Sequence, residues 1–174
     1  MDRRLKDPKN LILISLIALL TLAGTAMVIW HAADKTRVNC ARHIEELPSE
    51  LYHQVNTACR DWLRNAHVIS PEALRDWLSN ERIIYSGEPI EGERGRVQRL
   101  GSHILFSVPF CLDEREEGKC VHFIVGARRT AYHEAGHLVL MAAGIHTSEH
   151  HALMDAYRLC PGECPDNWDD LDRD

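Results

Sequence analysis

Tyr132-His133-Glu134-Ala135-Gly136-His137 contains the pattern H-E-x-x-H, on which our prediction of the fold depends. Two residues four positions apart share one face of a helix, so His133 and His137 can present their imidazoles to one ion. Glu134 would then lie beside that ion, where a carboxylate can accept the proton of a metal-bound water. The pattern predicts a helix that carries a zinc site.

The residues around this pattern also predict a helix. Val121 to Val125 is typical of a short buried strand, and Gly126 to Thr130 of a turn. Thr130 can cap a helix that starts at Ala131, and Gly144 is suited to end it. Apolar residues recur along the helix at helical spacing, namely Leu138, Met141, Ala142 and Ile145.

Reach limits the choice of a third zinc ligand. If the helix runs to about Ala143, its end lies about 9 Å beyond the second histidine of the pattern, at about 1.5 Å per residue. Two residues past Gly144 span at most about 7 Å, whereas six span about 20 Å. His146 is therefore at the limit of reach, and His150 and His151 are both within it.

A second helix is expected directly after this turn. Ser148 can cap a helix from Glu149 to about Leu159. That helix would carry His150 in its first turn and Met154 one turn further on.

The set His133-Glu134-x-x-His137, Gly144 and His150-His151-x-x-Met154 resembles the minimal zincin site of Spartan/SprT-type metalloproteases. Those proteins have H-E-x-x-H followed, after a loop, by a histidine that opens the next helix, with a bulky apolar residue four positions on. The resemblance implies that His133, His137 and His150 bind Zn²⁺ and that Glu134 is the general base. His151 stands where that family usually has glycine, so the choice between His150 and His151 stays open.

A metzincin-like alignment is the weaker of two resemblances. His146 and Met154 have the spacing of the third histidine and the Met-turn methionine of metzincins. Metzincins, however, have glycine three residues after the second histidine, where this chain has Leu140, and their third histidine comes sooner.

Hydropathy and charge predict four segments. Residues 1–10 are basic, and residues 11–30 carry no charge over about the length that a bilayer core requires. We expect residues 11–30 to form a transmembrane signal-anchor, with cleavage as a signal peptide near Ala26 as the alternative. Residues 31–160 would form a zincin-like extracytoplasmic domain, and residues 161–174 an acidic tail. The expected fold class is α+β, with an N-terminal transmembrane helix before a small zincin-like domain.

Six cysteines in a small domain indicate the oxidising side of a membrane. Local separation predicts three disulfides: Cys40 with Cys59, Cys111 with Cys120, and Cys160 with Cys164. The expected location is therefore a single-pass membrane protein whose main domain is periplasmic or extracellular.

The middle of the chain changes from helical to strand-forming residues. Ser49 can cap one helix, and Ser70-Pro71-Glu72 is a strong start for another. Residues 82–85, 97–110 and 119–125 are strand candidates, the last two joined in a hairpin between Cys111 and Cys120. By analogy with zincins, one of these strands would hold extended substrate by edge pairing.

These observations predict a membrane-anchored zinc metallopeptidase that hydrolyses peptide bonds by Glu134-assisted attack of a zinc-bound water. Its partner would be a peptide or protein substrate. The net charge of −6 and the lack of a basic, aromatic face argue against nucleic-acid binding. The alternative is a non-catalytic, disulfide-stapled, membrane-tethered binding module with a structural or incidental metal site.

Overall fold

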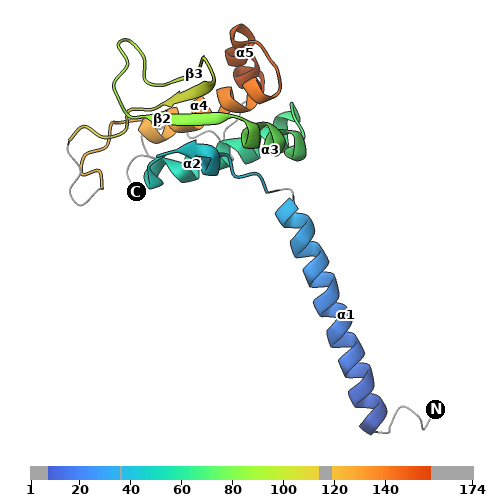
Figure 1. The fold of residues 1–174 in the computed structure, drawn as a ribbon. Coiled ribbons are helices and arrows are strands. Elements are labelled where there is room, and N and C mark those ends of the chain that lie inside the picture. The colour runs from blue at the N-terminus through green and yellow to red at the C-terminus, as the bar shows by residue number, and fades with distance from the viewer. Residues whose placement is uncertain (1–7, 36, 114–118, 158–174) are drawn as a thin grey trace. The chain divides into compact units, whose positions relative to one another are not determined.

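The computed structural model describes residues 8–35, 37–113 and 119–157. Contacts divide the chain into two units, Met1–Arg37 and Val38–Asp174 (Figure 1). The predicted Cys160–Cys164 disulfide and the predicted acidic tail of residues 161–174 lie outside the described residues.

The first unit contains one helix, α1, which spans Pro8–Lys35. No helix in the described parts of the chain has the length and apolarity that crossing a membrane requires. The predicted transmembrane signal-anchor over residues 11–30, and the fold class built on it, are therefore wrong. A run without charge is not by itself an apolar span. The uncharged run of residues 11–30 includes the hydroxyl residues Ser15, Thr21 and Thr25 and also Gly24, so it is not uniformly apolar.

The second unit confirms the α+β part of the predicted fold class. Its helices and strands alternate in an irregular order, and a single π-helical turn, η3, continues α2. The elements are η2 (Cys40–His43), β1 (Ile44–Glu45), α2 (Ser49–Asp61), η3 (Trp62–Ala66), α3 (Pro71–Asn80), β2 (Arg82–Ser86), β3 (Arg96–Leu100), β4 (His103–Ser107), α4 (Ala127–Ala142) and α5 (Thr147–Tyr157).

The four strands form one mixed sheet in the order β1-β2-β4-β3. β2 is parallel to both β1 and β4, whereas β3 and β4 form an antiparallel hairpin. Ile83 pairs with Ile104, and because side chains alternate along a strand, Phe106 lies on the same face as Ile104. These three side chains are buried in one core with Leu138 of α4. β3 remains at the edge of the sheet.

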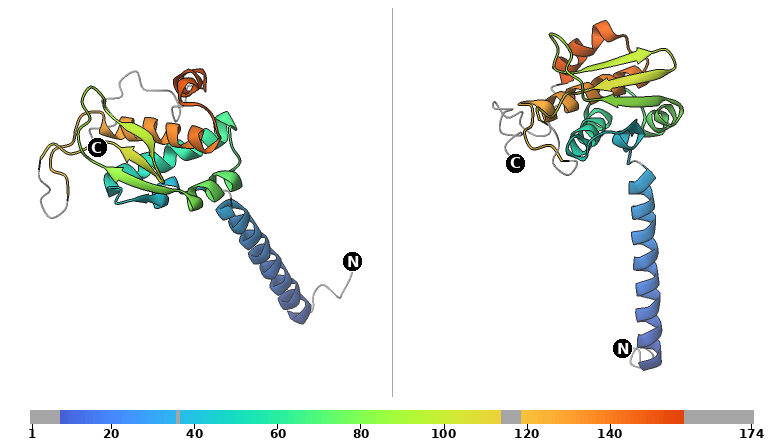
Figure 2. Two further views of the ribbon diagram at one scale, coloured as in Figure 1. Left: turned by 45° about the horizontal axis from the view of Figure 1, so that its top comes forward. Right: turned by 60° about the vertical axis from the view of Figure 1, so that its left-hand side comes forward.

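The helices α2 and α4 pack together on the buried side of the sheet (Figure 2). Gly136 allows this approach, because a Cβ there would lie 2.7 Å from Nε1 of Trp62. Trp62 is fully buried in the core. The Tyr132 hydroxyl of α4 donates a 2.8 Å hydrogen bond to the carboxylate of the buried Asp61 in α2, so a polar contact also links the two helices.

Helix starts agree with the sequence in part. The Ser70 hydroxyl accepts a hydrogen bond from the Ala73 N–H, so this predicted cap is confirmed. Ser49 is instead the first residue of α2 and makes no capping bond. α4 begins at Ala127, four residues before the predicted start. Thr130 therefore lies inside the helix, where its hydroxyl donates to the Gly126 carbonyl.

The disulfides Cys40–Cys59 and Cys111–Cys120 confirm two predicted pairings. The strand predicted over residues 121–125 is wrong, since the segment makes only an isolated bridge between Cys111 and Phe123. Val121 and Val125 are 46% and 73% exposed, so the apolar run does not follow a buried strand.

Candidate metal centre

The helix α4 has a core face and a site face. Ala131, Ala135 and Leu138 are fully buried, whereas His133 is exposed and His137 is half-buried. The two histidines are four residues apart and therefore lie on the same face, as the sequence predicted. The rigid helix sets the separation of their rings, with centroids 4.8 Å apart.

The end of α4 brings a third histidine to this face. Gly144 has φ of +72°, a left-handed conformation that favours glycine. The Gly144 N–H donates to the Met141 carbonyl, and the Ile145 N–H donates to the Leu140 carbonyl. These two hydrogen bonds form a Schellman turn. The turn reverses the chain, so α5 returns past α4. The sequence-based prediction that Gly144 ends the helix is confirmed.

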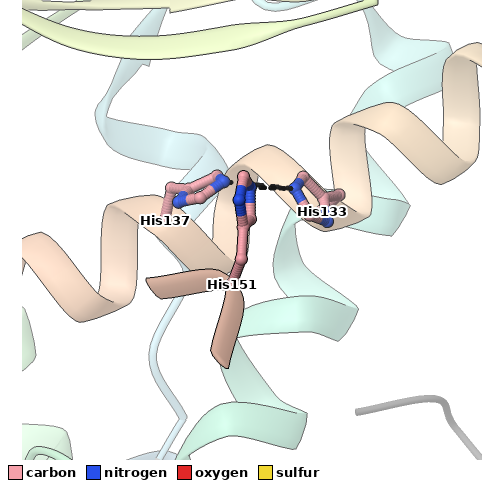
Figure 3. A group of neighbouring side chains, drawn as sticks. All are labelled: His133, His137 and His151. Atoms are coloured by element: carbon pink, nitrogen blue, oxygen red, sulfur yellow. Dashed lines mark hydrogen bonds between the residues drawn. The ribbon is translucent and has the colours of Figure 1, made fainter. Parts of the chain in front are cut away.

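Three imidazole rings converge at this point, two from α4 and one from α5 (Figure 3). Nε2 of His133 lies 3.1 Å from Nε2 of His137 and 3.4 Å from Nε2 of His151. The ligand atoms of the three residues all lie within 4.8 Å of one another, so the group could hold a metal ion.

These distances fit a tetrahedral ion. Zinc–nitrogen bonds of about 2.0 to 2.1 Å place two ligand nitrogens about 3.3 to 3.4 Å apart. The two contacts of His133 are close to that value. The ligand atoms of His137 and His151 lie no more than 4.8 Å apart, and rotation of the exposed His151 side chain can bring them closer.

His150 takes a different position from His151. It is fully buried, its Nε2 lies 3.0 Å from the Ile145 carbonyl oxygen, and its Nδ1 lies 2.9 Å from Nδ1 of His137. Its ring therefore faces the nitrogen of His137 that points away from the three-histidine group. His150 as a zinc ligand stays a prediction, and the geometry of the group favours His151.

The contacts of His150 determine the tautomer of His137. A carbonyl oxygen only accepts hydrogen bonds, so Nε2 of a neutral His150 carries the proton and its Nδ1 accepts. His137 must then donate from Nδ1, which leaves its Nε2 with a free lone pair. That nitrogen is the one that faces His133. Metal-binding histidines commonly donate their second ring N–H in this way.

The surroundings of His133 and His137 also favour the neutral form that binds metal. Loss of water contact, followed by the charges of His133, His150 and His151, lowers the pKa of His137 to about 3. Loss of water contact and the charge of His151 likewise lower the pKa of His133. Both rings can therefore offer lone pairs at neutral pH.

The Glu134 side chain lies between its own helix, α4, and the edge strand β3. It is 5% exposed, and burial, with the charge of Glu93, raises the pKa of its carboxyl to about 8. The Val97 N–H donates a hydrogen bond to it. Gly95 permits this close packing, because a Cβ there would lie 2.9 Å from Cγ of Glu134 and 2.5 Å from Cγ2 of Thr130.

A cavity of about 620 Å³ opens over the site. Its walls include residues 93–97 from the segment that enters β3, and residues of α4 and α5, among them His133, Glu134, His137 and His151. His146 does not line it. The cavity is large enough for several residues of an extended peptide.

Basic residues also line this cavity, and the sequence-based prediction of the site did not include them. Arg129 precedes His133 by four residues and so shares its helix face, which helical spacing alone could have revealed. Arg94 comes from the polar loop before β3, and Arg96 is the first residue of β3; the approach of this segment to α4 is a tertiary feature that no local pattern marks.

Comparison of the chain with protein-family models, with curated proteins and with solved structures finds no match. The function must therefore be inferred from the geometry of the site.

Proposed function

We propose that the chain is a zinc-dependent metallopeptidase that works in an oxidising, extracytoplasmic compartment. His133, His137 and His151 would hold the ion, and Glu134 would act as general base. The observation that carries the proposal is the convergence of three imidazole rings beside a buried carboxyl in one cavity, with Nε2 of His133 at separations from the other two rings that are close to those of a tetrahedral zinc site.

Each residue has a chemical task in this proposal. Zinc, when bound, supplies a Lewis acid that polarises a scissile carbonyl and lowers the pKa of water. Glu134 accepts a proton from the attacking water and passes it to the leaving nitrogen. His150 holds His137 in the tautomer that frees its Nε2. A metal site that only stabilised the fold would have no need of a carboxyl beside its ligands.

The first test is zinc stoichiometry, measured by elemental analysis of the purified full chain. Wild type is expected to bind one zinc, and His133→Ala, His137→Ala and His151→Ala to lose it. His146→Ala is the matched control, since His146 is exposed and lies outside the cavity. A folded wild-type protein without zinc affinity would refute the proposal, and zinc retained by His151→Ala would refute the ligand set.

The second test separates catalysis from binding. Glu134→Gln is expected to keep zinc and to reduce peptide hydrolysis at least about 100-fold, the usual loss when a general base is removed. Hydrolysis by the variant at the wild-type rate would exclude Glu134 as the base. A variant without effect on function in a zinc-bound protein would favour the non-catalytic binding module.

The compartment is supported by the two disulfides, because such bonds are rare in reducing cytosol. Labelling of intact cells with a membrane-impermeant thiol reagent, before and after reduction, tests it. Cys40, Cys59, Cys111 and Cys120 should react only after reduction. Reaction of these thiols only after lysis, without reductant, would contradict the proposal.

A further inference from the structure

A second cavity of about 330 Å³ adjoins the metal cavity. The two share Glu93, Arg94, Arg129 and Thr130 in their walls. The second cavity continues toward Pro89 and Ile90 on one side and toward the start of α4 on the other. A peptide that crosses the metal site can therefore extend into it.

Arginines dominate the charge along this passage. Arg94, Arg96 and Arg129 line the metal cavity, and Arg94 and Arg129 also line the second one. Glu93 is held by Arg96 through two hydrogen bonds of 2.6 and 2.7 Å, so those two opposite charges are matched. Arg94 then adds positive charge to the passage, and among the residues that the structure describes only Glu93 and Glu134 contribute acidic groups to its wall.

Arg94 reaches across the passage. Its Nη1 lies 3.8 Å from the position that a Cβ on Gly126 would occupy, so its guanidinium is close to the residue that precedes α4. Arg129 projects from the first turn of α4. The two arginines therefore approach the passage from different segments.

The position of Arg129 sets a distance from the metal centre. It precedes His133 by four residues, which corresponds to about 6 Å along the helix axis. An extended peptide advances about 3.3 Å per residue. A substrate side chain beside Arg129 and Arg94 would therefore lie about two residues from the bond that is cleaved.

We propose that this passage is a specificity subsite for an acidic side chain, Asp or Glu, located two or three residues from the scissile bond of a peptide substrate. The inference rests on the proposed peptidase function and adds the chemical class of its substrate. A guanidinium fork matches a carboxylate in shape and charge, and such charge-assisted bonds are stronger than neutral ones.

The experiment uses the full-length, zinc-loaded protein and a proteome-derived peptide library, followed by synthetic peptides that differ only by Glu, Gln or Lys at the selected position. Wild type is expected to cleave the Glu peptide with kcat/KM about tenfold higher than the Gln peptide. Arg94→Gln should reduce that preference, and Arg94→Glu should reverse it toward Lys. Arg64→Glu makes the same charge change on an exposed residue outside both cavities and should leave the preference intact.

The outcomes separate the subsite from the peptidase. Cleavage without acidic preference, or a preference unchanged by Arg94→Glu, would overturn the subsite and leave the peptidase. If the zinc-loaded protein cleaves nothing, the peptidase fails, and fluorescence anisotropy with the same three peptides tests the subsite alone. Binding selective for the Glu peptide and lost in Arg94→Glu would support the subsite, whereas binding that ignores charge would overturn it.

Discussion

Ionisation of Glu134 should lower the folding stability of the metal-free protein. This loss should fall in the same pH range in which catalysis would need the charged carboxylate. Its pKa is about 8 in the folded protein, against an ordinary value of 4.5. A raised carboxyl pKa favours folding fully below pH 4.5, and this contribution is lost as pH rises to about 8. At about 1.4 kcal/mol for each pH unit, the loss is at most about 5 kcal/mol. Water in the open cavity will reduce it, so we expect about 2 to 5 kcal/mol.

Glu134→Gln removes the ionisation and keeps an oxygen that can accept from the Val97 N–H. In the presence of a chelator, the variant should be more stable than wild type at pH 8 by that amount, and equally stable near pH 4.5. Urea unfolding at several pH values measures the difference, and comparing the two proteins at each pH cancels the other titrating groups.

Glu91→Gln, which changes an exposed carboxylate, is the control and should show no such dependence. Equal stability of wild type and Glu134→Gln at pH 8 would refute the conclusion that Glu134 is held in a poorly hydrated site. An advantage that does not shrink as pH falls would refute it as well.

Three further predictions test the supporting structure. His150→Leu should weaken zinc binding about 10- to 100-fold, whereas His150→Gln, which can still accept and donate, should stay near wild type in competition titrations; equal complete loss would make His150 a ligand. Gly95→Ala should cost about 1 to 3 kcal/mol in urea unfolding, because its Cβ would meet a Thr130 methyl, and adding Thr130→Ser should recover part of it; no recovery would refute that contact. Replacing Cys40 and Cys59 by Ala should cost about 3 kcal/mol for a loop of 19 residues, and an unchanged urea midpoint would contradict it.

The sequence predicted the parts of the site that depend on local spacing. His133, Glu134 and His137 lie on one helix, and the left-handed Gly144 ends it where expected, because periodicity and glycine conformation act over a few residues. The length of chain after Gly144 showed that His146 could barely reach the metal site and that His150 and His151 could both reach it, but it did not distinguish those two. Only the direction in which α5 returns distinguishes them, and that depends on packing between helices.

Tertiary interactions explain the predictions that were wrong. The run of residues 121–125 is apolar, but among the described residues it forms only one isolated bridge, because a strand needs a partner from elsewhere in the fold and a local pattern does not supply it. β2 and β4 pair in parallel through residues about twenty positions apart, with β3 between them in the chain, and no short pattern encodes such a pairing. The uncharged run of residues 11–30 lies within the helix α1, but a lack of charge does not by itself make a helix apolar enough to span a membrane.

α5 is attached to the rest of the domain by few groups. His150 is its only fully buried residue, and an edge contact between Tyr157 and Trp62, with ring centroids 6.2 Å apart, adds to the half-buried Leu153 and Met154. α4, in contrast, lies in the core. An ion bound by both helices would therefore hold α5 against α4, and loss of the ion would allow α5 to unfold locally. Amide hydrogen exchange in α5 should slow when zinc is added, whereas exchange in the middle of α4 should already be limited by global unfolding and should change less.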